Sequence, residues 1–262
     1  MTAKDILQFL ETLAPRTMKM DWDNVGLLCG RESREVNRIL VALDPFEGVC
    51  QEAARWGADL IVTHHPLIFT APRAITDDTS VGRSILFLAR HDIAAINAHT
   101  NLDCAPGGVN DCLASVLGLE QVRVLNPEGV DAQGRPWGLL RAGLVEQTPL
   151  KGFLDQIKQR LGCPGLRYAD GGRPVRQVAV GGGACADGVR EVFDAGCDTF
   201  VTADVKYNQF WDARDLGLNL VDAGHFWTEN PVCDYLAAQL QAQFPEILVK
   251  VSEHHRDCIK FW

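Results

Sequence analysis

Short apolar runs bounded by glycine, proline and polar residues recur along this chain and predict buried strands. Such runs stand at residues 38–43, 60–63, 93–96 and 176–180. Helical periodicity of apolar residues occupies 47–56, 150–161 and 187–195. Continuous apolar strands that alternate with helices are typical of parallel sheets covered on both faces. The pattern therefore predicts an α/β fold.

One strand–helix–strand pattern occurs twice. The first copy closes with Gly57-Ala58-Asp59-Leu60-Ile61-Val62-Thr63, and the second closes with Gly196-Cys197-Asp198-Thr199-Phe200-Val201-Thr202. Both closing segments read Gly-x-Asp-x-x-Val-Thr. Because element order, spacing and closing motif agree, we interpret them as an internal βαβ repeat rather than a coincidence. The repeat predicts two similar α/β domains.

A turn-rich segment from Asn126 to Pro136 predicts a domain boundary. The expected division is residues 1–125 plus 218–262 for the first domain and 126–217 for the second, similar domain. In the second domain, Gly181-Gly182-Gly183 follows a strand and precedes a helix. The run lacks the Gly-x-Gly-x-x-Gly pattern and the P-loop lysine, so a tight turn is favoured over a phosphate cradle.

Composition narrows the class of protein. The hydrophobic fraction of 47% and the charged fraction of 23% are those of an ordinary globular chain. The formal net charge of −9 disfavours a nucleic-acid partner, and no apolar run reaches the ~18 residues that cross a membrane. Nine cysteines without a Cys-x-x-Cys pair predict reduced thiols and a cytoplasmic location, with Cys29 and Cys233 as small buried residues.

Two adjacent histidines, His64 and His65, follow the strand at 60–63 and precede Pro66. Neighbouring side chains of a strand point to opposite faces, but the alternation ends where Pro66 takes the chain out of the sheet. The pair either converges on a metal ion or hydrogen-bonds to backbone at the sheet rim, and the pattern leaves both open. The second copy continues with Ala203-Asp204 instead, so a metal site would belong to the first half.

Two further pairs combine histidine with a carboxylate. His99 and Asp103 follow the strand at 93–96, while His225 and Glu229 are spaced i, i+4, which places them on one face of a helix. Taken alone, His99 is typical of a structural histidine and Asp103 of a helix N-cap. Taken together, four histidines at strand ends or a helix start favour a metal site. The other histidines stand in polar contexts and are expected to face solvent: His91, His254 and His255.

Five separated motifs together resemble the dinuclear metal-centre family related to the Ngg-interacting factor, also called Nif-three-like. Members often carry the description GTP cyclohydrolase type 2 homologue. The motifs stand in the family's order and span nearly the whole chain. They are Trp22-Asp23-Asn24-Val25-Gly26-Leu27, Thr63-His64-His65-Pro66, His99-Thr100-Asn101-Leu102-Asp103, Thr202-Ala203-Asp204-Val205-Lys206-Tyr207, and Gly224-His225 with Thr228-Glu229.

The resemblance implies a cleft that holds two divalent metal ions. The implied ligands are His64, His65, Asp103, His225 and Glu229. His99 is implied beside the site, where it orients a ligand or a bound water. As our own hypothesis, Glu229 takes a proton from the attacking water if it does not bridge the ions, and His99 donates one. Imidazole and carboxylate ligands suit Zn, Mn, Fe, Co or Ni. The family also implies homo-oligomers, often hexameric rings.

The implied function is a dinuclear-metal-dependent hydrolase that acts on an unidentified small molecule. The two ions would activate a water molecule for attack on carbon or phosphorus. A purine nucleotide is suggested by the family's description alone. The alternative is a non-enzymatic, ring-forming assembly or regulatory protein that binds metal.

Three features leave the substrate side of the site open. Trp22-Asp23-Asn24 either lines the cleft or forms a turn before the next strand, and the turn is favoured. Lys206 and Tyr207 either contact phosphate or lie at a domain interface, and the interface is favoured. The chain departs from the family pattern around Ala203-Asp204 and Asn208, and at Asn230-Pro231 after Glu229.

Overall fold

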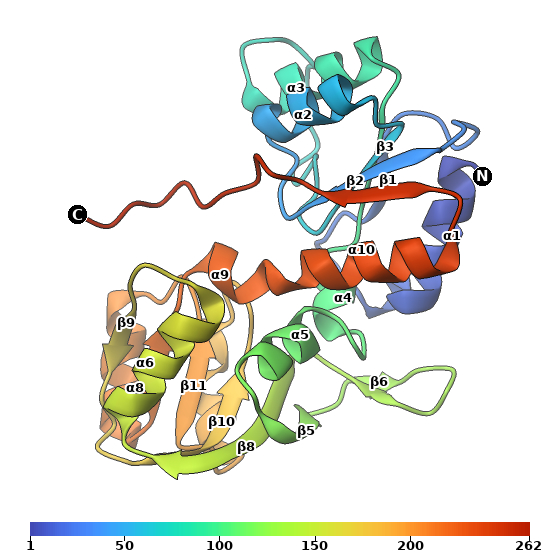
Figure 1. The fold of residues 1–262 in the computed structure, drawn as a ribbon. Coiled ribbons are helices and arrows are strands. Elements are labelled where there is room, and N and C mark those ends of the chain that lie inside the picture. Colours follow the sequence, from blue (N-terminus) through green and yellow to red (C-terminus); the bar gives the residue numbers. More distant parts are fainter. The chain divides into compact units, whose positions relative to one another are not determined.

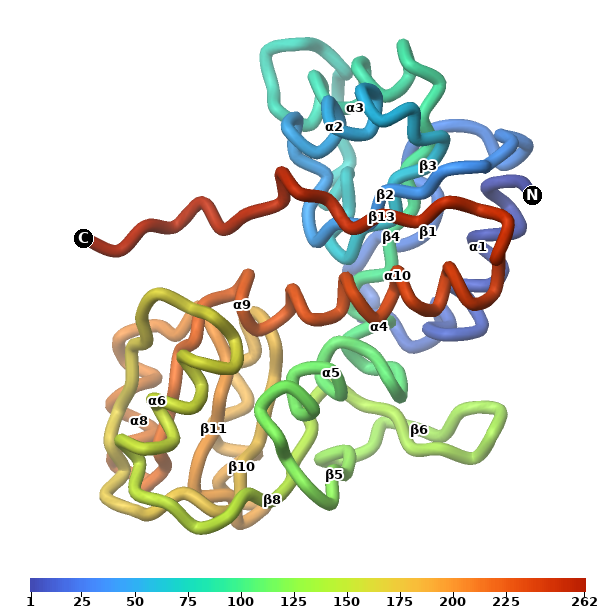
Figure 2. The backbone as a smooth tube through the Cα atoms, viewed as in Figure 1, coloured from blue at the N-terminus to red at the C-terminus, as the bar shows by residue number.

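The computed structural model describes residues 1–262, which divide into two compact units (Figure 1). Unit 1 comprises Met1–Leu102 and Val232–Arg256, and unit 2 comprises Asp103–Pro231 and Asp257–Trp262. Figure 2 follows the chain path: the blue to cyan segment and the red helix and strand near the C-terminus build unit 1. Each unit has its own mixed sheet with helices, which confirms the prediction of two similar α/β domains.

Unit 1 contains a five-stranded sheet of order β1-β4-β3-β2-β13. Strands β2, β3, β4 and β13 pair in parallel, and β1 pairs antiparallel with β4. The strands are β1 Gly26–Cys29, β2 Arg38–Ala42, β3 Leu60–Thr63, β4 Ala94–Asn97 and β13 Leu248–Val251. The helices are α1 Ala3–Leu13, a 3-10 turn Arg16–Met18, α2 Glu47–Trp56, α3 Ser80–Arg90 and α10 Pro231–Gln243, while α4 Thr100–Cys104 begins in unit 1 and enters unit 2 at Asp103.

Both faces of the unit 1 sheet are covered. Leu40, Ile61 and Ala95 point from β2, β3 and β4 into one apolar cluster with residues of α2 and α3. Because side chains alternate along a strand, Val41 and Val62 belong to the opposite face. Figure 1 shows α2 and α3 on one side of this sheet and α1 and α10 on the other.

Unit 2 contains a six-stranded sheet of order β5-β8-β10-β11-β12-β9 and a small hairpin. Helices α5 and α6 pack on one face of the sheet, and α7 and α8 pack on the other. The strands are β5 Glu120–Leu125, β6 Gly129–Val130, β7 Pro136–Trp137, β8 Leu140–Thr148, β9 Arg167–Ala169, β10 Val175–Val180, β11 Thr199–Thr202 and β12 Asn219–Asp222. The helices are α5 Val109–Val116, α6 Leu150–Leu161, a 3-10 turn Ala186–Gly188, α7 Val189–Asp194, α8 Tyr207–Leu216 and α9 His225–Glu229.

The motif that closes each βαβ copy has a structural role. Asp59 accepts hydrogen bonds from the backbone N–H groups of residues 37 and 38, where β2 begins. Asp198 accepts them in the same way from residues 176 and 177 in β10. The motif's glycines, Gly57 and Gly196, both have positive φ where the helix ends. The shared residues therefore fix the strand–helix–strand geometry. The candidate site residues come after the closing strand of each copy, where the two copies differ in sequence.

The domain division differs from the one expected from the sequence. Residues 103–125, 218–231 and 257–262 are expected in the first domain, whereas the structure groups them with unit 2. The reason is hydrogen bonding, because β5 pairs with β8 and β12 pairs with β11 in the second sheet. The turn-rich segment at 126–136 is part of the β6–β7 hairpin within unit 2 rather than a boundary.

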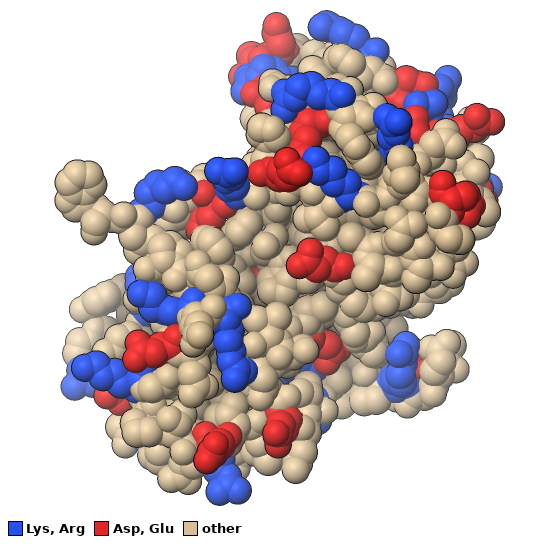
Figure 3. Space-filling model, in the orientation of Figure 1, with Lys and Arg blue, Asp and Glu red and all other residues tan.

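The composition led us to expect reduced cysteine thiols and charged surface side chains without a basic patch. All nine cysteines are free thiols, with Cys233 buried and Cys29 half-buried against the α2–α3 cluster. On the face shown in Figure 3, basic and acidic side chains are interspersed, and no continuous basic surface is visible. None of the helices combines the length and the apolar character that a membrane span requires.

A carboxylate of α2 holds the chain after β13. Glu52 is buried and accepts hydrogen bonds from the Ser252 hydroxyl and from the backbone N–H groups of Glu253 and His254. Burial opposes ionisation, but these hydrogen bonds outweigh it and hold the pKa of Glu52 below its ordinary value. The ionised carboxylate therefore fixes a turn two hundred residues away in sequence.

Replacing Glu52 with glutamine is expected to destabilise unit 1 at neutral pH by about 1–3 kcal/mol, because the amide nitrogen cannot accept these hydrogen bonds. A depressed pKa stabilises the fold above the carboxyl group's unfolded pKa of about 4.3 and loses that effect as pH falls. The free-energy difference between wild type and Glu52→Gln, measured by urea denaturation, should be largest near pH 7 and shrink toward pH 3. A difference that is independent of pH would contradict this assignment.

Candidate metal centre

Unit 1 brings three histidines together at one edge of its sheet. His64 and His65 follow β3, and His99 follows β4. Because β3 and β4 are parallel neighbours with Thr63 opposite Asn97, the residues after both strands meet at the same edge. Ligand nitrogens of the three imidazoles lie within 4.8 Å of one another, so this cluster can hold a metal ion. The histidine cluster, defined as these three residues, contains two predicted ligands and the predicted neighbour His99.

Each imidazole of the histidine cluster is oriented through its Nδ1 atom. His64 Nδ1 lies 2.9 Å from the carbonyl oxygen of Ala98. His65 Nδ1 lies 2.7 Å from Asp44 Oδ1, and His99 Nδ1 lies 2.8 Å from Asp23 Oδ1. A carbonyl oxygen only accepts, and the carboxylates do so when ionised, so Nδ1 carries the proton in the neutral rings. The lone pair is then on Nε2, the arrangement found in metal-binding histidines.

The two carboxylates beside these histidines are ionised. Burial opposes ionisation of Asp23, but hydrogen bonds from His99 and Thr100 hold its pKa well below the usual range. Burial likewise opposes ionisation of Asp44, and its contacts with His255 and His65 hold its pKa well below the usual range. Asp23 lies next to a turn at 21–22, so the Trp22-Asp23-Asn24 motif both forms the expected turn and orients His99.

Sequence reasoning missed Asp44 and misplaced His255. Asp44 follows β2 in a Leu-Asp-Pro context that carries no metal-site pattern. His255 was expected to face solvent, but it is buried, and its Nε2 lies 3.7 Å from Asp44 Oδ2. The Glu52-anchored turn places it there, a long-range contact that local polarity does not reveal. His91 and His254 are exposed, as expected.

Replacing Asp44 with asparagine is expected to weaken metal binding about tenfold to hundredfold, the usual cost of losing a residue that orients a metal ligand. The amide keeps the size of the side chain but removes the negative charge that faces His65. Isothermal titration of metal-depleted protein with Zn²⁺ would measure the change. Asp212→Asn, at an exposed position of α8, is the matched control and should bind like wild type. A Zn²⁺ affinity of Asp44→Asn equal to that of wild type would show that Asp44 does not orient a metal ligand.

Unit 2 forms a second group from the predicted residues on α9. His225 Nε2 lies 3.0 Å from Glu229 Oε2, so the i, i+4 pair shares one helix face as predicted. His225 Nδ1 lies 2.7 Å from Asp204 Oδ2, which repeats the histidine–carboxylate arrangement of unit 1. Asp204 follows β11 at the position that His65 occupies after β3, and it has φ of 51°. Its left-handed backbone, uncommon outside glycine, directs the carboxylate to His225.

This group strongly favours positive charge. Burial opposes protonation of His225, but hydrogen bonds to Asp204 and Glu229 raise its pKa to about 11. The same carboxylates that stabilise a proton on the imidazole would stabilise a metal cation at this position. Metal binding to His225 therefore requires displacement of a proton, as it does for histidine ligands generally.

Asp103 joins this group through a network of amide hydrogen bonds. A carboxylate oxygen of Asp103 lies within 4.8 Å of one of Glu229. The buried Asn110 side chain donates to the Asp103 carbonyl oxygen and accepts from the Gly182 N–H. We refer to Asp103, His225 and Glu229 as the carboxylate cluster. Its members come from α4 and α9, which follow β4 and β12 in equivalent positions of the two units.

The glycine run at 181–183 is the turn that accommodates the carboxylate cluster. Gly183 has φ of +64°, and a Cβ atom there would lie 2.1 Å from Glu229 Oε1 and 3.1 Å from His225 Nε2. Its N–H donates to the Thr228 hydroxyl. The backbone of the run therefore closes against protein groups, which supports the turn over the phosphate cradle. Sequence reasoning noticed the run but missed that Gly183 makes room for a predicted ligand.

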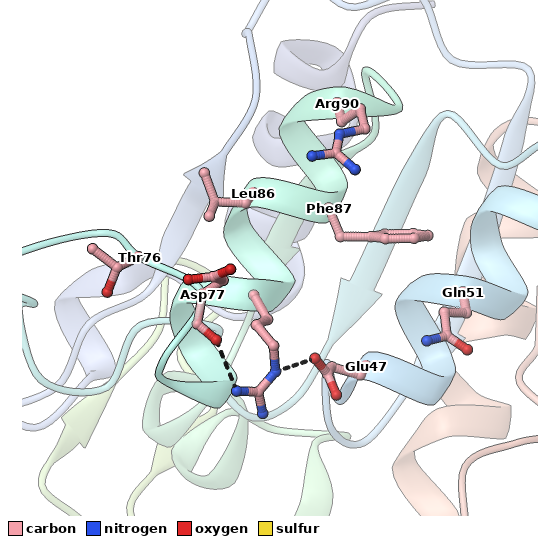
Figure 4. Close-up of a pocket in the computed structure, with 8 residues that line it drawn as sticks. Glu47, Gln51, Thr76, Asp77, Leu86, Phe87 and Arg90 are labelled. Atoms are coloured by element: carbon pink, nitrogen blue, oxygen red, sulfur yellow. Dashed lines mark hydrogen bonds and ion pairs between the residues drawn. The ribbon is translucent and has the colours of Figure 1, made fainter.

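The structure also contains a hollow between α2 and α3, about 480 Å³ in volume (Figure 4). Arg83 lines this hollow and donates hydrogen bonds to the Glu47 carboxylate and to the carbonyl oxygen of Asp77. None of the predicted metal ligands lines this hollow. Elsewhere, Tyr207 is 79% exposed at the start of α8.

The fold and the two clusters define an α/β protein with candidate metal-binding groups at the carboxyl ends of its parallel strands. Residues 1–257 match the sequence profile of the family described as Duf34/NIF3 (NGG1p interacting factor 3). The chain belongs to this family, as its motifs led us to expect.

Known relatives cover the whole chain. A Clostridium perfringens protein named GTP cyclohydrolase 1 type 2 homolog is 35% identical over 264 residues, covering 100% of both chains. A protein of the same name from Streptomyces coelicolor is 39% identical over 241 residues, which are 90% of this chain and 84% of that protein. The crystal structure of a Bacillus cereus protein related to NIF3 superposes with a TM-score of 0.93 at 27% identity, covering 100% of this chain and 99% of that one.

Proposed function

We propose that the protein binds two divalent transition-metal ions and hydrolyses a small-molecule substrate. The proposed ligands are His64 and His65 of the histidine cluster with Asp103, His225 and Glu229 of the carboxylate cluster. Bound there, the ions would supply a water molecule that is acidic enough to act as a nucleophile near neutral pH.

One observation carries this proposal: four imidazoles, three in unit 1 and His225 in unit 2, are each oriented through Nδ1 by an oxygen acceptor. Metal-binding histidines almost always have such support at the ring nitrogen that does not bind the metal. The donor set of imidazoles and carboxylates suits Zn, Mn, Fe, Co or Ni. The space that Gly183 leaves beside Glu229 fits the same purpose, because a side chain there would displace the carboxylate.

Two residues of the chain are proposed to move protons. His99 is oriented by the Asp23 carboxylate and is the proposed proton donor to a leaving group. If Glu229 does not bridge the two ions, it is the proposed base that accepts a proton from the attacking water. The relatives named GTP cyclohydrolase 1 type 2 homolog make purine nucleotides the first substrate class to test.

The test is turnover by purified protein that retains its native metal, assayed against nucleotides, phosphoesters and cyclic amides. We expect hydrolysis of a member of this panel, with His64→Ala and Glu229→Gln lowering kcat at least hundredfold. Glu246→Gln, on the exposed segment after α10, is the matched control and should keep wild-type activity.

Absence of turnover across the panel at full metal occupancy would contradict the enzymatic proposal. It would favour the alternative that the protein is a metal-binding assembly or regulatory factor.

A further inference from the structure

Two exposed aromatic side chains stand beside the histidine cluster in unit 1. Trp22 is 62% exposed and Phe69 is 58% exposed. Their ring centroids are 5.6 Å apart, and each lies 6.2 Å from the His99 ring. The His99 ring also lies 5.1 Å from the His64 ring and 5.5 Å from the His65 ring. His99 therefore neighbours both the aromatic pair and two of the proposed metal ligands.

The backbone beneath the two aromatic residues is firmly held. Asp23, next to Trp22, accepts hydrogen bonds from His99 Nδ1 and from the Thr100 N–H. The Asn24 side chain donates to the carbonyl oxygen of Ile68, the residue before Phe69, at 2.7 Å. Two segments that are 44 positions apart are thus tied together, and the rings they carry are presented as a fixed pair.

The geometry of the pair suits a flat ligand. The planes of the Trp22 and Phe69 rings are inclined at 56° to each other. A conjugated ring can stack on one of them and meet the other with its edge, and both arrangements are favoured by aromatic quadrupoles. Two aromatic side chains bury at most about 150–250 Å² each, which is well below the ~800 Å² that a stable protein partner needs. The pair therefore fits a small planar molecule better than a second chain.

We propose that Trp22 and Phe69 bind a planar heteroaromatic ring of the substrate and place its edge against His99. The inference rests on the proposed function, since it assigns the substrate class of the same site. It extends that function by assigning recognition of the substrate's ring to two residues that are not among the proposed metal ligands. Aliphatic and purely phosphorylated compounds would lack the ring that the pair recognises.

The test is binding to protein that retains its native metal, measured by isothermal titration calorimetry. The flat probes are guanosine 5′-monophosphate, pterin-6-carboxylate and nicotinate. The matched probes without an aromatic ring are ribose 5-phosphate and cyclohexanecarboxylate. We expect at least one flat probe to bind wild type at least tenfold more tightly than its matched probe. Stacking on an aromatic side chain requires a π face in the ligand, which the matched probes lack.

Trp22→Leu and Phe69→Leu should each weaken the bound flat probe roughly tenfold to hundredfold. Trp22→Phe should restore most of the affinity, since it keeps an aromatic face. Trp211→Leu is the matched control, because Trp211 is 47% exposed on α8 of unit 2, and it should bind like wild type. Metal content should be unchanged in all four variants.

Three results would overturn the inference: no flat probe binds wild type, the affinity of Trp22→Leu equals that of wild type, or Trp22→Leu changes the molar mass in solution. The last would show that the pair contacts a second copy of the chain. Any of these results in protein with its full metal content leaves the proposed function standing. Loss of metal binding with intact ring recognition would instead remove the proposed function and keep the aromatic site.

Discussion

Replacing Gly183 with alanine is expected to weaken metal binding about tenfold to hundredfold, although Gly183 is not itself a proposed ligand. The added Cβ would lie 2.1 Å from Glu229 Oε1, so either the carboxylate or the turn must move. Thr228 binds the Gly183 N–H, and the buried Asn110 binds the N–H of Gly182, so the turn has little freedom to shift. The displaced group is therefore Glu229. Zinc titration followed by elemental analysis would measure the loss.

The control separates this clash from backbone strain. An alanine at positive φ costs about 1–2 kcal/mol in folding free energy wherever it stands. Gly172 has φ of +75°, and a Cβ atom there would meet nothing within 4 Å. Gly172→Ala should therefore share the loss of stability and bind metal normally. Normal metal binding by Gly183→Ala would show that the glycine run has no part in the site.

Replacing Arg141 with methionine is expected to lower the free energy of unfolding by about 3–5 kcal/mol. Arg141 is only 1% exposed, and it pairs with both carboxylate oxygens of Asp111. It also donates to the carbonyl oxygens of Cys104 and Ala105, directly after Asp103. Methionine fills the space but removes the positive charge that faces the Asp111 carboxylate and one hydrogen bond from each of the carbonyl oxygens of Cys104 and Ala105. Urea denaturation followed by fluorescence measures the effect.

The matched control is Arg190→Met. Arg190 forms an i, i+4 pair with Asp194, but its side chain is 71% exposed. Exposed pairs of this kind contribute little to the free energy of unfolding, because solvent screens them. A loss at Arg141 no larger than the loss at Arg190 would mean that the buried guanidinium does not hold the segment after Asp103.

The sequence predicted most of the fold because its signals are local. Residues 47–56 and 150–161 form α2 and α6 with the expected limits, since their apolar spacing and their terminal Gly57 and Gly162 act within a few residues. The βαβ repeat was visible for the same reason. The domain limits were not, because strand pairing across the sheets, such as β5 with β8, depends on contacts that local periodicity does not encode.

The candidate site shows the same division between local and distant information. The i, i+4 pair of His225 and Glu229 was predicted from spacing and lies on one helix face. Asp44 and His255 were missed, because their approach depends on a turn that Glu52 holds from a distant helix. The structure also shows that His99 and Asp103 repeat the i, i+4 spacing after β4, which a comparison of the two halves beyond the βαβ motif would have found.

The most direct test of the account is the metal content of the protein as purified, determined by elemental analysis with the chain concentration measured in parallel. We expect about two transition-metal equivalents per chain at saturation. We also expect that His65→Ala loses at least one equivalent, and that a double variant with His64→Ala and His65→Ala loses more. Full occupancy in the folded double variant would contradict the account.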